Sequence, residues 1–306
     1  MTETTFADLP NEILISILST FRTLDLLSIT LTSHRIHSLI LRILHHRLLE
    51  TAQLTQHKLI LEVFHPSTKL STPYLFCDFL GTYCLSVPQD TDQPTNPHVY
   101  RDKQKGRADV NGGAMGLSEL RSLYSHFRPL KPSSDYTLTR THPAGGTFKI
   151  PNGLVDRHDE FVCQNIHLES HELFSQLQTI TSLVKVGPRR GLFLSSVNIS
   201  EDILRIWRPW LAARAGSSAG EADLEGREGL LWVDRQKNVG LRVGVVEREE
   251  TTAVLVGTDE DAPVSYTLQY EELVIKATQL LLMVEQSVDQ EVSHSGKAIV
   301  IGSWDQ

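Results

Sequence analysis

Apolar residues recur at helical spacing through residues 8–49, and this segment constrains the chain more than any other. The first run opens with Leu9-Pro10, after an acidic residue suited to capping a helix. Proline suits a first helical turn, because its missing N–H would have no partner there. Thr23 and Ser33 are residue types that begin helices, and apolar runs follow both. The segment therefore predicts three short helices.

The second of these helices carries more apolar surface than one packing partner can cover. Its two stripes are Leu24, Leu27 and Leu31 on one side, and Leu26 and Ile29 on the other. We expect one stripe to face the neighbouring helices and the other to lie in water, together with Leu9 and Ile15. Two interpretations follow. Either the rest of the chain covers the surplus surface, or the surface binds a partner.

The spacing in this segment is similar to that of a known motif. Its order is Leu9-Pro10-x-Glu12-Ile13-Leu14-x-x-Ile17-Leu18, then Asp25-Leu26-Leu27 with Leu31, then Ser33-His34-Arg35-Ile36-His37-Ser38-Leu39. This order resembles the F-box motif. The segment that follows, residues 57–81, resembles one found in fungal F-box proteins of unassigned activity.

The resemblance implies a partner and a set of contact residues. F-box helices dock on the Skp adaptor of Skp–cullin–F-box ubiquitin ligases. The family's adaptor-contact positions match here at Leu9, Pro10, Ile13, Ile17, Leu26, Leu27, Leu31 and Leu39. One position departs from the pattern, because Ile36 stands where many F-boxes have tryptophan or phenylalanine.

Composition narrows the class of protein further. The 306 residues carry a net charge of −8 without a long basic run, so we expect no nucleic-acid partner. Three cysteines, Cys77, Cys84 and Cys163, form no metal-type pair and cannot all be paired as disulfides. No signal peptide or membrane-spanning segment is predicted. These features favour the cytoplasm or the nucleus.

The period changes from helical to strand-like near residues 52–58. Runs at 58–64, 74–79, 161–168, 230–233 and 239–246 predict short strands bounded by turn residues. We therefore predict an α+β protein with an F-box at residues 1–52. A mainly antiparallel, β-sandwich-like domain with a few covering helices is predicted for residues 53–306.

Several segments of the second part are predicted in more detail. Polar and small residues predict mobile loops at 88–116 and 212–228. Apolar spacing predicts helices over 170–184 and 200–211, each preceded by a capping serine. The run 264–283 reads either as one strand or as a strand followed by a helix.

No residue is assigned a catalytic role, and no metal or cofactor is predicted. His158, His167 and His171 lie near acidic residues, but they lack the spacing of an established zinc motif. The pair His45-His46 reads as a solvated helix face. Arg189-Arg190 reads as a solvated turn, with an acidic partner as the alternative.

Two functional hypotheses follow from the resemblance. The first is a non-catalytic substrate receptor of a ubiquitin ligase, which holds an unknown target protein on its β-rich domain. The second is an F-box protein that acts outside a ligase, or an enzyme or ligand-binding domain that carries an F-box.

Overall fold

The computed structural model describes ten segments of the chain. It covers residues 9–66, 74–84, 116–131, 140–141, 147–148, 161–187, 192–216, 229–248, 263–293 and 299–300. The predicted loop 88–116, except for Gly116, and most of the predicted loop 212–228 lie outside these residues. The first five residues of the second loop, 212–216, are helical, so that part of the loop prediction is wrong.

Three helices form the N-terminal part, as the sequence predicts. They are α1 (Asn11–Leu18), α2 (Thr23–Ile29) and α3 (His34–Ala52). The Ser33 hydroxyl accepts a hydrogen bond from the Ile36 N–H at 3.2 Å, which confirms Ser33 as the cap of α3. Pro10 precedes α1 as its N-cap residue, and Thr23 is the first residue of α2 rather than its cap.

The change from helix to sheet takes place over a few residues after α3. Leu54 has a φ of 47°, a left-handed conformation that glycine usually adopts at a helix C-terminus. Its side chain packs against the core of the sheet, which helps to hold this conformation. Strand β1 (His57–Phe64) begins three residues later.

All but two of the strands belong to one antiparallel sheet, ordered β12-β8-β7-β1-β2-β3-β11-β10-β9, with β6 paired to β11. Its strands are β1, β2 (Leu75–Cys84), β3 (Leu123–Pro129), β6 (Val162–Leu168), β7 (Phe174–Val186), β8 (Leu192–Trp207), β9 (Leu230–Trp232), β10 (Val239–Arg248), β11 (Val264–Lys276) and β12 (Ile299–Val300). Strands β4 (Arg140–Thr141) and β5 (Thr147–Phe148) pair separately. The predicted α+β class and antiparallel sheet are confirmed.

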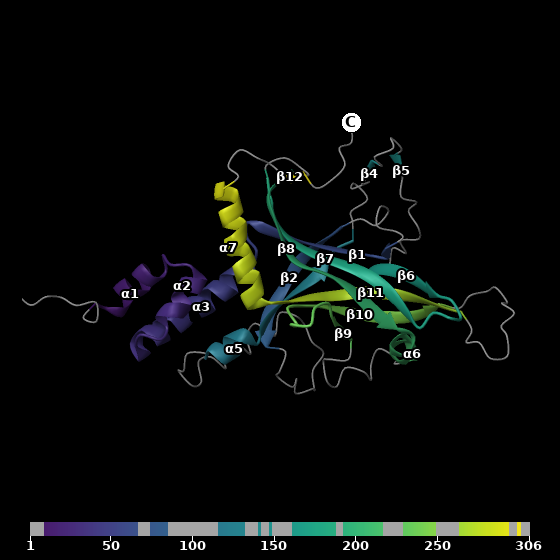
Figure 1. The fold of residues 1–306 in the computed structure, drawn as a ribbon, viewed down its shortest axis with the longest axis horizontal. Helices are drawn as coiled ribbons and strands as arrows, with labels where there is room; N and C mark the ends of the chain where they lie inside the picture. The colour runs from purple at the N-terminus through teal and green to yellow at the C-terminus, as the bar shows by residue number, and fades with distance from the viewer. Residues whose placement is uncertain are drawn as a thin grey trace, which may run out of the picture.

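The sandwich-like packing comes from one sheet that curls. Helix α6 (Arg208–Gly216) packs against both β8 and β10, although β7, β1, β2, β3 and β11 lie between those strands in the sheet. The main apolar cluster accordingly draws residues from both halves, including Leu177 and Leu204 on one side and Leu241 and Leu268 on the other. Figure 1 shows the sheet on one side of the molecule and α1–α3 on the other.

Helix α7 (Ala277–Ser293) lies between these two parts (Figure 1). It continues directly from β11, so the strand-then-helix alternative for residues 264–283 is correct. Its Leu280 belongs to the core of the sheet, whereas Ala277 and Leu281 belong to a second cluster with Leu14 and Leu26 of the N-terminal helices. Leu120 of helix α5 (Leu117–Arg121) joins that second cluster. The N-terminal helices therefore share their core with elements from the other end of the chain.

Two predicted helices are strands in the structure. Residues 174–186 form β7, where burial alternates residue by residue along most of the strand. Alternating burial is the period of a strand, and the buried side includes Ser175, Thr179 and Thr181, which an apolar pattern does not register. Residues 200–207 complete β8, and the helix that follows, α6, begins only at Arg208.

We expect Leu281→Ala to destabilise the protein by about 2–4 kcal/mol, because it opens a cavity in the cluster that α7 shares with the N-terminal helices. The measurement is the free energy of unfolding in urea. Val292→Ala is the matched control on the same helix, since Val292 is exposed, and it should change stability by less than about 0.5 kcal/mol. Equal effects of the two changes would contradict a shared core.

Candidate partner-binding surface

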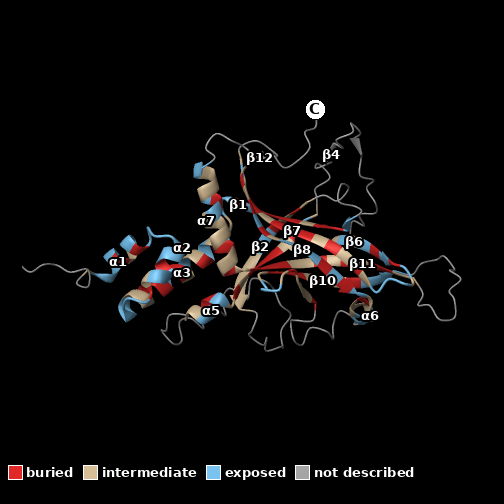
Figure 2. Cartoon of the chain, in the orientation of Figure 1, coloured by how far each residue is buried: buried red, intermediate tan, exposed pale blue. Residues whose placement is uncertain are grey.

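The N-terminal helices leave several large apolar residues exposed to water, and Figure 2 shows exposed stretches along α1, α2 and α3. Leu26 is fully buried, whereas Leu24 is 62 % exposed and Leu31 is 91 % exposed. The two predicted stripes of α2 thus separate into an inward and an outward face. The exposed large apolar residues of α1, α2 and the turns after them are Ile13, Ile17, Phe21, Leu24, Leu27 and Leu31. We call these six residues the apolar face.

The structure places the eight predicted adaptor-contact residues in three environments. Ile13, Ile17, Leu27 and Leu31 belong to the apolar face, and Pro10 is also exposed. Leu9 and Ile15 are half-buried, although both were expected to lie in water. Leu26 and Leu39 lie in the core of the helices. A partner could contact the Leu26 and Leu39 side chains only if the helices moved. For the other six residues, contact with the adaptor stays a prediction.

Hydrogen bonds from α3 hold the start of α1 in place. Arg35 donates from Nε to Asn11 Oδ1 at 2.9 Å, and from Nη2 to the Leu9 carbonyl at 2.6 Å. Below these polar contacts, Leu14 and Leu18 of α1 pack against the apolar side of α3. The Leu9-Pro10 corner is therefore tied to α3, and the exposed Ile13 and Ile17 follow it along α1.

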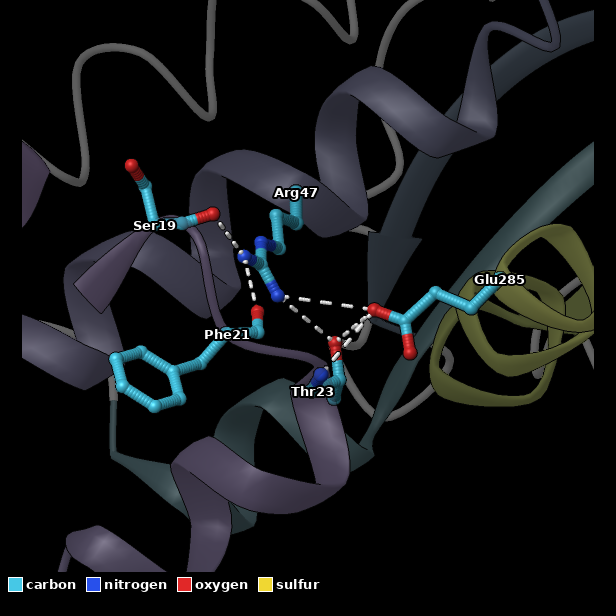
Figure 3. Close-up of polar contacts among 5 residues, drawn as sticks. All are labelled: Ser19, Phe21, Thr23, Arg47 and Glu285. Carbon is cyan, nitrogen blue, oxygen red and sulfur yellow. Dashed lines mark hydrogen bonds and ion pairs between the residues drawn. The ribbon is translucent and has the colours of Figure 1, made fainter. Parts of the chain in front are cut away.

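A second set of hydrogen bonds holds the turn between α1 and α2 (Figure 3). Arg47 of α3 donates from Nη2 to the carbonyls of Ser19 and Phe21, both at 2.8 Å. Its Nη1 lies 3.6 Å from Glu285 Oε1 of α7. That oxygen also accepts hydrogen bonds from the Thr23 hydroxyl at 2.6 Å and the Thr23 N–H at 3.2 Å. A carboxylate from the last helix thus satisfies a free donor at the start of α2.

An ion pair lies one turn further along α7. The Arg22 guanidinium donates two parallel hydrogen bonds to the Asp289 carboxylate, at 2.8 and 2.7 Å. The two side chains are 66 % and 47 % exposed, so water weakens this pair. The Arg47 and Glu285 side chains are only 19 % and 28 % exposed. Of the two links between α7 and the turn, the one through Glu285 is better shielded.

The most buried ionisable cluster of the described residues lies elsewhere, on the sheet. His126 Nδ1 is 2.9 Å from Glu272 Oε1, and Arg242 donates from Nε to Glu272 Oε2 at 3.1 Å. The Tyr83 ring stacks on the His126 ring with centroids 3.7 Å apart. Burial by itself would raise the pKa of Glu272. The hydrogen bond and charge of His126, together with Arg242, outweigh burial, and the pKa of Glu272 is lowered.

This cluster has the composition of an acid–base pair but not the accessibility of one. His126 is fully buried, and Glu272 is held between two basic side chains. A general base must reach the proton that it removes from a substrate. The geometry therefore supports a structural role, in which β3, β10 and β11 are linked through one carboxylate.

Other candidate sites from the sequence give no catalytic or metal centre within the described residues. No group of three His, Cys, Asp or Glu side chains there is placed to hold a metal ion. His167 contacts Ser265 at 2.8 Å, while His158 and Arg189-Arg190 lie outside the described part of the chain. His46 is exposed and pairs with Glu50 at 3.1 Å, which agrees with a solvated helix face. His45 is half-buried, and burial lowers its pKa, so the prediction does not hold for His45.

One serine motif was missed in the sequence. Residues 216–220 read Gly-Ser-Ser-Ala-Gly, which fits the G-x-S-x-G pattern of serine hydrolases. That pattern places its serine after a strand and before a helix. Here a helix, α6, leads into the motif, and Ser218 lies outside the described residues. The segment before the motif is therefore a helix, where the pattern requires a strand.

Comparison with known proteins identifies the helical part. The exposed apolar face of these helices is typical of a surface that binds a partner. An F-box-like family model matches residues 6–51, so the chain contains an F-box-like domain, as the resemblance implied. Domains of this family generally bind the Skp adaptor of ubiquitin ligases and are typically non-catalytic. Neither a curated protein nor a solved structure matches the chain.

The Glu272 cluster predicts a pH dependence of stability. Because the pKa of Glu272 is lowered in the folded state, its stabilisation is present above the unfolded-state pKa of about 4.3. The stabilisation is lost as the pH falls through the folded-state pKa. We expect Glu272→Gln to be less stable than the wild type at pH 7, with a difference that narrows below about pH 4.3. Urea unfolding from pH 7 to pH 3 measures this.

The control for this series is Glu12→Gln, which removes an exposed carboxylate of α1. The difference in its free energy of unfolding from the wild type should change with pH less than that of Glu272→Gln. A constant difference between Glu272→Gln and the wild type from pH 7 to pH 3 would contradict the assigned role of Glu272.

Proposed function

We propose that this protein is a substrate-recognition subunit of a Skp–cullin–F-box ubiquitin ligase. The F-box-like domain docks on the Skp adaptor, and the β-rich domain holds a target protein. The observation that carries the proposal is the apolar face of α1 and α2. It lies within the matched domain, and no described residue buries it. Such a face is unfavourable in water unless a partner covers it.

The proposed role requires no chemistry from the chain itself. A receptor brings a target lysine close to a ubiquitin-loaded enzyme, and proximity raises the rate of transfer. The buried Glu272 cluster and the absence of a metal-binding group among the described residues are compatible with that role. None of the described helices has the length and apolarity needed to span a membrane. We place the protein in the cytoplasm or the nucleus, where the ligase acts.

The arrangement of the molecule gives the target a place away from the adaptor. Helix α6 and the end of β8 lie at the opposite end of the molecule from α1–α3 (Figure 1). Three exposed apolar side chains gather around that end of the β7–β8 pair: Leu173, Ile203 and Trp207. Trp207 contacts Phe174, with ring centroids 5.0 Å apart. A target bound there would leave the apolar face free for the adaptor.

Purification from the native cell separates this proposal from its alternative. The wild-type chain should recover both the Skp adaptor and a cullin, together with at least one protein that accumulates when the gene is deleted. Recovery of the adaptor without a cullin would favour an F-box protein that acts outside a ligase. Turnover of a small molecule by the purified chain would favour an enzyme that carries an F-box.

Ile17→Asp should weaken binding to the purified Skp adaptor at least about tenfold, because it places a charge within the apolar face. Ile17 is exposed, so the change should leave folding intact. The measurement is a binding titration, with circular dichroism to verify the fold. Val292→Asp on α7, which also places a charge at an exposed valine, is the matched control and should bind like the wild type. Unchanged affinity of a folded Ile17→Asp variant would count against docking through this face.

A further inference from the structure

We infer that Glu285 is a positioning residue for adaptor binding: it fixes the start of α2, and with it the apolar face, from the last helix of the chain. The inference rests on the proposed function and adds a residue outside the matched domain, which ends at residue 51. It is carried by the hydrogen bonds around Thr23 and by the way α7 meets the N-terminal helices.

Helix α2 lacks a cap of its own. Its N-cap residue is Arg22, whose side chain carries only donors, and no side-chain hydrogen bond caps the helix from that position. Free N–H groups in the first turn of a helix need an acceptor. Glu285 supplies it for Thr23, accepting from both the N–H and the hydroxyl of that residue. Thr23 is buried, so water does not readily replace this acceptor.

The same carboxylate also orders the turn that enters α2. Glu285 lies against Arg47, whose guanidinium holds the carbonyls of Ser19 and Phe21 at the end of α1 (Figure 3). Removing the Glu285 charge would leave Arg47 without its shielded counter-ion. The relative direction of α1 and α2 therefore depends on Glu285 at two points. Leu24 and Leu27 of the apolar face follow within the next turn.

Helix α7 is built to hold Glu285 at this place. Ala277, Leu281, Glu285 and Asp289 are spaced four residues apart, so they form one stripe along the helix. Ala277 and Leu281 enter the apolar cluster of the N-terminal helices, and Glu285 and Asp289 make the polar contacts beyond it. On its other side, α7 is fixed to the sheet through Ser287, whose hydroxyl lies 3.0 Å from His57 Nε2. Glu285 thus acts from a helix that is itself anchored.

The test compares three variants of the full chain by titration with the purified Skp adaptor. Glu285→Ala should weaken binding about tenfold, because a buried acceptor and a counter-ion are lost together. Glu285→Gln should weaken it about threefold, since the amide oxygen still accepts from Thr23 but no longer balances Arg47. Asp289→Asn, the control on the same stripe, should weaken it less than about twofold, since its ion pair is exposed.

Amide hydrogen exchange of the same proteins without adaptor provides the second readout. Glu285→Ala should speed exchange in α2 about tenfold, in line with a lost cap, and leave exchange in β7 and β11 unchanged. If Glu285→Ala is insoluble, the adaptor affinity and the α2 exchange rate of Glu285→Gln serve as the test in its place. Adaptor affinity within twofold of the wild type, or exchange in α2 no faster than in Asp289→Asn, would overturn the inference.

The two proposals fail in different ways. If the wild-type chain does not bind the adaptor, the proposed function is wrong, whatever the variants do. In that case the exchange data still decide whether Glu285 holds α2. If the wild type binds and Glu285→Ala binds equally well, only the positioning role is wrong.

Discussion

The structure depends on one apolar cluster that joins the first helices of the chain to its last. Leu14, Leu18 and Leu26 meet Leu281 there, and Leu120 closes another side. About forty residues bury too little surface to be stable alone, so three short helices need additional partners. Helix α7 and α5 provide those partners from within the chain. The F-box-like domain is therefore one continuous segment of the sequence, but its apolar core includes residues from outside that segment.

This packing also explains which side chains stay outside. Helix α3 packs against the inner sides of α1 and α2, and α7 packs against α3, so Leu26 and Ile29 turn inward and Leu24, Leu27 and Leu31 remain in water. Polar contacts then set the angle at which the exposed side is held, through Arg35 at one end and Arg47 with Glu285 at the other. A surface fixed in this way loses little conformational freedom when a partner binds.

The sequence allowed the N-terminal helices, the α+β class and several strands to be predicted, because each has a strong local pattern. Ser33 caps α3, and Leu24 and Leu26 of α2 separate into an exposed and a buried side, as their spacing indicates. Strand β7 was mistaken for a helix because its buried side carries Ser175, Thr179 and Thr181. The apolar residues alone then fit a helical period, whereas the β-branched Thr179, Ile180 and Thr181 favour a strand.

The contacts that complete the candidate site could not be predicted from local patterns. Thr23 and Glu285 are 262 residues apart, and neither belongs to a motif that specifies the other. Glu285 lies in a stretch that reads only as acidic and polar. The strand-then-helix alternative for residues 264–283 was correct, but its packing side depends on the whole sheet that precedes it. The predicted domain boundary near residue 52 stays a prediction. The apolar cluster includes residues from both sides of that boundary.

The distance in sequence between Thr23 and Glu285 has a consequence during synthesis. A ribosome that adds about 5–20 residues per second needs roughly 13 to 52 seconds to make the 262 residues between them. Throughout that interval the nascent N-terminal helices lack both Leu281 and the Glu285 carboxylate. A chain that is truncated before α7 lacks them permanently. Full ordering of the N-terminal helices therefore requires that translation has reached α7.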